Sequence, residues 1–321
     1  MRPISHLAAW CCLAAALLAA CDRTPPGRQV DSKFPELWKE YSGAKAFEHV
    51  RRQVEIGPRP AGSEAIAKAQ DHIATTLRAY GWEVEIQSFT ATPTQTAGAI
   101  NYANIIARFP TLHGQPAPRN TQRAIVASHY DTKRMDGVTF LGANDSASST
   151  GALLELARVL ATVPALAQQM ELVFFDGEEA IVEFEDPDTG SDGLVGSRHY
   201  AGVLRGTGRA AQFRFAIVWD MIGDANLGIT FPSDSPRAIA GGLLTAAEVL
   251  GTRKYLGYAS TPILDDHVPL ARIARIPAID IIDFDYPHWH AATDTLDKLS
   301  PDSLQTIGQI TLWYLHRELS K

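Results

Sequence analysis

Cysteine is scarce in this sequence. Only three cysteines occur among the 321 residues, and Cys11, Cys12 and Cys21 all lie within the first 21 positions. The chain beyond that point therefore has no residue for a disulfide, a thiolate nucleophile or a cysteine-based zinc site. Any metal ion bound there must be held by histidine, aspartate and glutamate side chains.

A long run of lysine and arginine is also missing. The formal net charge is −7, with 29 basic and 36 acidic residues. This balance argues against nucleic acid or an anionic lipid surface as the main ligand. The remaining composition, 45% hydrophobic and 20% charged, is that of a globular protein with a sizeable core.

One extended apolar run stands near the N-terminus, at residues 7–21, shortly after Arg2. The run is too short for a comfortable membrane span but suits the core of a signal peptide. Its last four residues, Leu18-Ala19-Ala20-Cys21, resemble the lipobox of bacterial lipoproteins. That resemblance implies cleavage before Cys21 and a lipid on the new N-terminal cysteine, while a plain secretory signal or a short anchor is the alternative.

The lipobox resemblance divides the chain into three parts. We predict a signal peptide over residues 1–20, a lipid-bearing cysteine and flexible Pro-rich tether over 21–33, and a single catalytic domain over 34–321. The expected location is the bacterial cell envelope, with the lipid in a membrane and the domain facing the periplasm or the exterior. Whether that membrane is the inner or the outer one stays open, and the domain is expected to be a monomer.

Beyond residue 34, short apolar segments alternate with helical ones. Residues 123–128, 170–175, 214–220 and 276–284 each have the character of a buried strand. Continuous apolar strands separated by amphipathic helices indicate a largely parallel sheet that is covered on both faces. The sequence therefore predicts an α/β fold, a three-layer α/β/α sandwich with a mixed, mostly parallel central sheet.

Acidic residues and histidines gather where the predicted strands end. His129 follows the first of these strands, Glu178 and Glu179 follow the second, Asp220 ends the third and His290 comes shortly after the fourth. Ligands of open parallel sheets bind outside the carboxyl ends of the strands. Four strand ends that each deliver imidazole or carboxylate, with no sulfur, favour a Zn²⁺ site built from nitrogen and oxygen ligands.

Each of these residues has a plainer interpretation when taken alone. Asp145 could cap a helix, His129 could be a structural histidine, and the pair Glu178-Glu179 could lie on a solvated loop. The joint pattern favours a site, because independent accidents would not all fall at strand ends.

Several segments resemble the M28 metallopeptidase clan and, within it, the glutaminyl-peptide cyclotransferases (glutaminyl cyclases). The likeness runs from "EIGPRPAGS" to the C-terminal helix, and the segments occur in the family's order: "SHYDTK", "GANDSA", "FFDGEEA", "GSRHYA", "DDHVPLAR" and "WHAATDTLD". The resemblance implies a zinc aminopeptidase-like fold. It also implies metal ligation by Asp145, Glu179 and His290, with Glu178 as the general acid/base.

On the cyclase branch, the resemblance implies one zinc ion and a reaction that converts the N-terminal glutamine of a peptide or protein to pyroglutamate. Asp265 and Asp220 would then form a carboxylate network with Glu178. The substrate pocket would be formed by Trp289, Phe184 and Tyr286. The cyclases usually have tryptophan where this chain has Phe184, and the segment "DYPHWH" is one residue shorter than its counterpart.

On the aminopeptidase branch, His129 and Asp220 would complete a site for two zinc ions that share Asp145. Glu178 would then activate a water molecule for hydrolysis of the first peptide bond. Asn144 and the segment "HAATDT" are closer to this branch. A metal-free, non-catalytic binding protein is a third class, which is disfavoured because every ligand position is filled. The cyclase is the favoured prediction.

Overall fold

The computed structural model describes residues 36–93, 98–111, 122–182, 184 and 192–320. The chain divides into one unit of Met1–Pro35 and a second of Glu36–Lys321, and only the second contains described residues. The predicted signal peptide, Cys21 and the tether therefore lie outside the described residues. Within the described ranges, no helix has both the length and the apolar character that crossing a bilayer requires.

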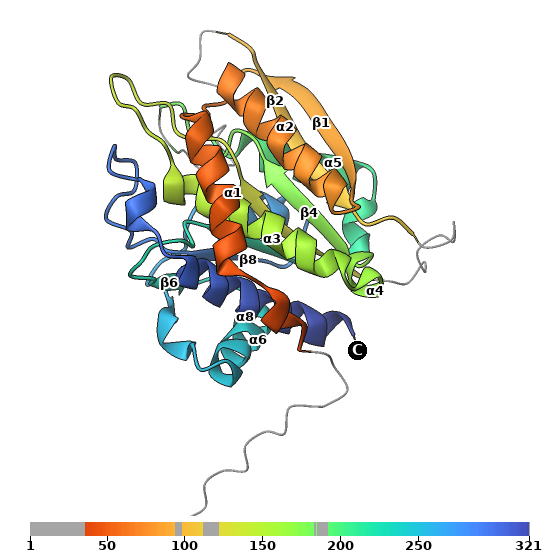
Figure 1. Cartoon of the computed structure of the whole chain (residues 1–321). Helices are drawn as coiled ribbons and strands as arrows, with labels where there is room; N and C mark the ends of the chain where they lie inside the picture. The colour runs from red at the N-terminus through yellow and green to blue at the C-terminus, as the bar shows by residue number, and fades with distance from the viewer. Residues whose placement is uncertain (1–35, 94–97, 112–121, 183, 185–191, 321) are drawn as a thin grey trace, which may run out of the picture. The chain divides into compact units, whose positions relative to one another are not determined.

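In the described part of the chain, an eight-stranded mixed sheet forms the middle layer, in the order β1-β2-β4-β3-β5-β8-β6-β7 (Figure 1). The strands are β1 (Glu83–Ala91), β2 (Ile100–Arg108), β3 (Arg123–His129), β4 (Met170–Phe175), β5 (Phe213–Asp220), β6 (Ile229–Phe231), β7 (Leu256–Tyr258) and β8 (Ala278–Ile282). Strands β4, β3, β5 and β8 run parallel to one another, as do β6 and β7. The β1–β2, β2–β4 and β6–β8 pairs are antiparallel.

The helices are α1 (Gly43–Ile56), α2 (Glu64–Ala79), α3 (Ser149–Ala161), α4 (Pro164–Ala167), α5 (Val195–Gly206), α6 (Arg237–Val249), α7 (His267–Arg272) and α8 (Pro301–Leu319). Three of them begin with a serine cap, since the Ser42 side chain accepts a hydrogen bond from Lys45 N at the start of α1. The Ser63 side chain accepts a hydrogen bond from Ile66 N at the start of α2, and Ser300 accepts one from Asp302 N at the start of α8. Such caps satisfy backbone donors that the first helical turn leaves free.

The two faces of the sheet belong to different apolar clusters. Ala124 and Val126 of β3 pack in the cluster that contains residues of α1, α3 and α8, whereas Ile125 and Ala127 pack in the cluster with α5 and α7. This alternation follows from the two-residue period of a strand. In Figure 1, α1, α3 and α8 lie together on the near face of the sheet. The predicted α/β sandwich with a mixed sheet is confirmed.

Candidate active site

Four neighbouring parallel strands bring their carboxyl ends to one edge of the sheet. His129 is the last residue of β3 and Asp220 the last of β5. Glu178 and Glu179 follow β4, and His290 lies in the segment after β8. The first four of these side chains are buried. The strand-end residues that the sequence singled out therefore meet, as the parallel arrangement requires.

Asp145, Glu179 and His290 form one group whose ligand atoms all lie within 4.8 Å of one another. His290 Nε2 is 3.1 Å from Glu179 Oε2 and 3.4 Å from Asp145 Oδ2. Ligand atoms that surround a zinc ion tetrahedrally at about 2.0–2.1 Å are about 3.3–3.4 Å apart. The spacing of these atoms therefore suits a shared metal ion.

The hydrogen bonding of Glu179 supports the same conclusion. Both of its carboxylate oxygens are buried, and neither accepts a hydrogen bond from a described residue. Burial and the charge of Asp145 raise the pKa of Glu179 to about 7, although His290 opposes the shift. A buried carboxylate without a donor is costly unless a cation compensates it, and Lys133 Nζ, at 3.8 Å from Glu179 Oε2, is too far away to donate a hydrogen bond. The residues present thus fit a metal ion on chemistry as well as on spacing.

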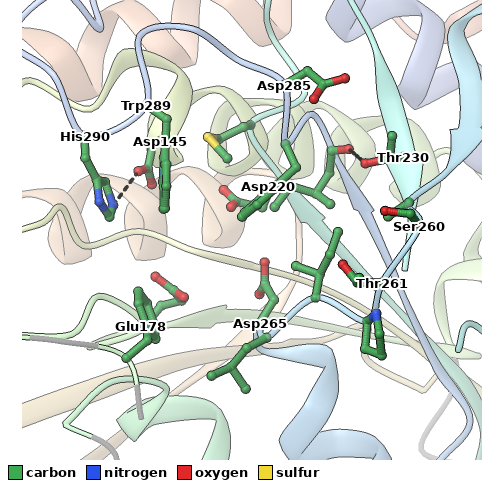
Figure 2. A pocket seen from close by; sticks show the side chains of 18 of the residues that line it. Asp145, Glu178, Asp220, Thr230, Ser260, Thr261, Asp265, Asp285, Trp289 and His290 are labelled. Carbon is green, nitrogen blue, oxygen red and sulfur yellow. Dashed lines mark hydrogen bonds and ion pairs between the residues drawn. The ribbon is translucent and has the colours of Figure 1, made fainter. Parts of the chain in front are cut away.

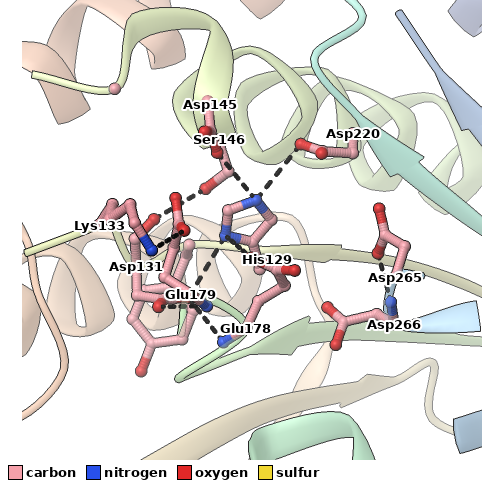
Figure 3. A network of polar contacts seen from close by, with 12 residues as sticks. His129, Asp131, Lys133, Asp145, Ser146, Glu178, Glu179, Asp220, Asp265 and Asp266 are labelled. Carbon is pink, nitrogen blue, oxygen red and sulfur yellow. Dashed lines mark hydrogen bonds and ion pairs between the residues drawn. The ribbon is translucent and has the colours of Figure 1, made fainter. Parts of the chain in front are cut away.

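His129 lies at the centre of a second group, which shares Asp145 with the first (Figure 3). Its Nε2 atom is 3.2 Å from Asp145 Oδ1 and 3.3 Å from Asp220 Oδ1, while its Nδ1 atom is 3.3 Å from Asp131 Oδ1. Burial opposes protonation of this ring. The charge of Glu178 and the bonds to the three aspartates nevertheless raise the pKa of His129 well above its ordinary value. The group could therefore hold either a proton on His129 or a second cation.

The turn after β4 is built to present both glutamates. The backbone N–H groups of Glu178 and Glu179 donate to the two oxygens of Asp131, at 3.2 Å each. Gly177 has a φ of +72°, and a Cβ atom there would meet the Tyr102 ring at 2.4 Å. Only glycine fits this turn. Asp131 comes two residues after the end of β3, and nothing in the sequence indicated that it holds this turn.

Asp145 is held from the other side of the site by Asp294. The N–H groups of Asn144 and Asp145 donate to the two Asp294 oxygens, at 2.8 and 3.1 Å. The Tyr286 hydroxyl also donates to Asp294 Oδ1, at 2.8 Å. Asp294 stands in the segment "WHAATDTLD", but nothing in the sequence indicated that it fixes a proposed ligand.

A fully buried arginine ties the loop that leads to Asp145 into the fold. The Arg59 guanidinium donates to the carbonyl oxygens of Gln53, Gly57, Tyr130, Leu141 and Gly142. Arg59 is 0% exposed, and burial lowers its pKa to about 10, against the charges of Asp131, Asp294 and Asp145. Sequence reasoning missed this residue, because an arginine in a Pro- and Gly-containing loop usually lies in solvent.

Glu178 shares the site with further carboxyl groups. Burial and the charges of Glu179 and Asp265 raise the pKa of Glu178 well above its ordinary value, against the effect of His129. Burial and Asp220 do the same for Asp265. Neighbouring carboxyl groups that cannot all ionise share protons. Asp280, which lies inside β8, belongs to the same network. An acid within an otherwise apolar strand is a signal in the sequence that could have identified this residue.

A cavity of about 630 Å³ opens beside these groups (Figure 2). Phe184 and Trp289 both line it, and Trp289 stacks on His290 with 4.3 Å between ring centroids. Tyr286, by contrast, is not among the described residues that line the cavity, and its side chain is buried. Its hydroxyl is turned to Asp294 instead of to the pocket, so the structure gives Tyr286 a supporting position and not the predicted place in the wall.

Known proteins share both the sequence pattern and the fold. The model of peptidase family M28 matches residues 104–315. A glutaminyl-peptide cyclotransferase of Drosophila melanogaster is 29% identical over 298 residues, which cover 84% of this chain and 80% of that protein. A glutaminyl-peptide cyclotransferase of Gloydius blomhoffii is 32% identical over 308 residues, which cover 82% of this chain and 78% of that protein.

Solved structures of both branches superpose well. A glutaminyl cyclase from an Acidobacteriales bacterium matches with a TM-score of 0.76 and 32% identity, covering 87% of this chain and 95% of that one. A leucine aminopeptidase precursor from Bacteroides thetaiotaomicron matches with a TM-score of 0.74 and 26% identity, covering 86% and 97%. The chain belongs to peptidase family M28 and, within it, to the group that includes the glutaminyl-peptide cyclotransferases.

Proposed function

We propose that this protein is a zinc-dependent glutaminyl-peptide cyclotransferase, which converts the N-terminal glutamine of peptides or proteins to pyroglutamate and releases ammonia. The observation that carries the proposal is the place of Glu178. This buried carboxyl group has a raised pKa, and it lines the same cavity as Trp289 and the three residues of the metal-ligand group. The names of the relatives in both comparisons support the same activity.

Asp145, Glu179 and His290 would hold the zinc ion, since their ligand atoms converge and no described residue donates a hydrogen bond to the Glu179 oxygens. When bound, zinc would polarise the carbonyl of the glutamine side-chain carboxamide. The ligand geometry depends on Asp294 and Asp131, which hold the two segments that carry Asp145 and Glu179.

The chain's own residues would handle the protons. As the α-amine attacks the carboxamide carbon, Glu178 takes a proton from that amine and then gives one to the departing nitrogen, which leaves as ammonia. The atoms balance, because one C–N bond forms, one breaks and no water is consumed. Asp265 would keep Glu178 in a range where it can both accept and donate a proton, since the charge of Asp265 opposes the ionisation of Glu178. Asp220 would contribute through Asp265, whose pKa its charge raises.

A two-zinc aminopeptidase is the second candidate. The group of His129, Asp145 and Asp220 favours it, because these residues would complete a second metal site that shares Asp145. His129 Nε2 lies 3.2 Å from Asp145 Oδ1 and 3.3 Å from Asp220 Oδ1, a spacing that would suit a shared ion as well as a proton on His129. A protonated His129 would offset one of these negative charges, so the number of zinc ions per chain distinguishes the two candidates.

Two chromogenic substrates and a metal determination separate these candidates. The purified protein should release ammonia from glutaminyl-naphthylamide, yield the pyroglutamyl product and contain one zinc ion per chain. Free naphthylamine from leucyl-naphthylamide, together with two zinc ions per chain, would instead establish the aminopeptidase.

A pair of glutamine substitutions tests the division of roles between the adjacent glutamates. Glu178→Gln should lower kcat by about a thousandfold and retain the metal, because it removes only the proton carrier. Glu179→Gln should lose the metal as well, because it removes a ligand. Equal metal loss in both variants would contradict the assignment.

We further propose that the protein acts as a monomer on peptide N-termini in the bacterial cell envelope, anchored by lipid on Cys21. The apolar run and the sequence Leu18-Ala19-Ala20-Cys21 support this. Cys21→Ser should move the protein from the membrane fraction to the soluble fraction. Unchanged membrane association would point to an uncleaved anchor instead.

A further inference from the structure

The cavity extends well beyond the candidate metal ligands. Its volume of about 630 Å³ lies in the range of pockets that enclose whole small-molecule ligands. Besides the metal side, it is lined by Thr230 of β6, Tyr258 at the end of β7, residues 259–264 after β7, and Phe284 and Asp285 after β8. We call this second set the outer wall, and Figure 2 shows Thr230, Ser260 and Thr261 across the cavity from Trp289 and His290. The proposed cyclisation uses none of its residues.

Exposed aromatic rings line the cavity on both sides. Tyr258, Phe284 and Trp289 are 51%, 47% and 42% exposed, and all three line it. The Phe284 and Trp289 rings lie 5.4 Å apart, and Tyr258 packs edge-on against Phe231 at 5.7 Å. Large exposed rings gathered around a concavity are typical of a binding surface.

Acidic side chains predominate in the lining of the cavity. Among the described residues that line it, six are acidic and none is lysine or arginine. Five of the acids belong to the metal and proton-transfer groups. The sixth, Asp285, is exposed on the outer wall, and no described residue forms a hydrogen bond or an ion pair with its carboxylate.

We propose that the outer wall is a subsite for a basic side chain, arginine or lysine, at the second position of the peptide substrate. The inference rests on the proposed function, since it places the N-terminal glutamine at the metal side. A long aliphatic stem can lie along the Tyr258 and Phe284 rings, a cationic group interacts favourably with an aromatic face, and Asp285 supplies the opposite charge. An acidic residue at the second position would be repelled.

Three peptides that differ only at the second position test the proposal. Ammonia release from Gln-Arg-Ala-Ala, Gln-Leu-Ala-Ala and Gln-Glu-Ala-Ala amides gives kcat/KM for each. We expect the arginine peptide to exceed the glutamate peptide by about tenfold, chiefly through KM, with the leucine peptide between them. The preference should shrink as salt is raised, because exposed charges are screened.

Asp285→Asn should reduce the arginine-to-glutamate ratio about threefold and leave the leucine peptide nearly unchanged. Asp71→Asn is the matched control, because Asp71 is also an exposed acid, lies on α2 and does not line this cavity. The inference is overturned if the wild type cyclises all three peptides equally. It is also overturned if Asp285→Asn behaves like Asp71→Asn. If the protein cyclises none of the three peptides, the proposed function is overturned, and the inference with it.

Discussion

The two sides of the cavity are built differently. On the metal side, Asp145, Glu178 and Glu179 are buried, and the backbone on which they stand is fixed by Asp131 and Asp294. On the outer wall, residues 260–262 are exposed, and Tyr258 presents half of its side chain to solvent.

The difference follows from what each side must do. Metal binding and proton transfer need ligand atoms held to within a fraction of an ångström, which requires supporting hydrogen bonds on rigid elements. Recognition of a variable peptide tolerates a looser wall. Substitutions on the metal side should therefore cost far more than those on the outer wall.

The largest effect is expected from Arg59→Met. Five carbonyl acceptors lose their donor, and a buried polar group left without a partner costs about 1–3 kcal/mol. The free energy of unfolding, measured by urea denaturation, should fall by about 3 kcal/mol or more. Arg134→Met is the control, because Arg134 is exposed, and its change should stay within about 0.5 kcal/mol. If both variants lose the same free energy of unfolding, the buried contacts of Arg59 do not explain its contribution to stability.

A smaller but specific effect is expected from Asp294→Asn. The carboxamide keeps only one acceptor for the two N–H groups of Asn144 and Asp145. We expect zinc affinity or kcat to fall by about 10–100-fold, measured by competition with a chelator and by ammonia release. Tyr286→Phe, which removes only one donor to Asp294, should have a weaker effect in the same direction. An Asp294→Asn protein with unchanged metal affinity and kcat would contradict the supporting role.

The smallest effect is expected on the outer wall. Thr261 is exposed there, and the backbone contact that it makes with Ser233 does not involve its side chain. Thr261→Ala should change kcat/KM for glutaminyl-naphthylamide less than about twofold and the free energy of unfolding by less than about 0.5 kcal/mol. A loss as large as that of Asp294→Asn would abolish the distinction between the two sides.

The sequence predicted the metal side of the cavity but not the outer wall. The positions of Glu178, Glu179, Asp220 and His290 after apolar strands predicted their convergence, because parallel strands end at one edge of a sheet. The outer wall could not be predicted in this way. Its residues lie in β6, at the end of β7 and after β7 and β8. Strands β6 and β8 pair antiparallel, an arrangement that the apolar pattern alone does not reveal.

The sequence by itself determined the alternating α/β pattern, the absence of cysteine ligands beyond Cys21, and the set of acids and histidines available to a metal ion. These are local properties of composition and periodicity. Only the tertiary structure decided that Arg59 is buried, that Asp294 holds Asp145, and that Tyr286 supports the site instead of lining the cavity. Such roles depend on contacts between residues far apart in the chain, so the partner of each group becomes known only when the chain is folded.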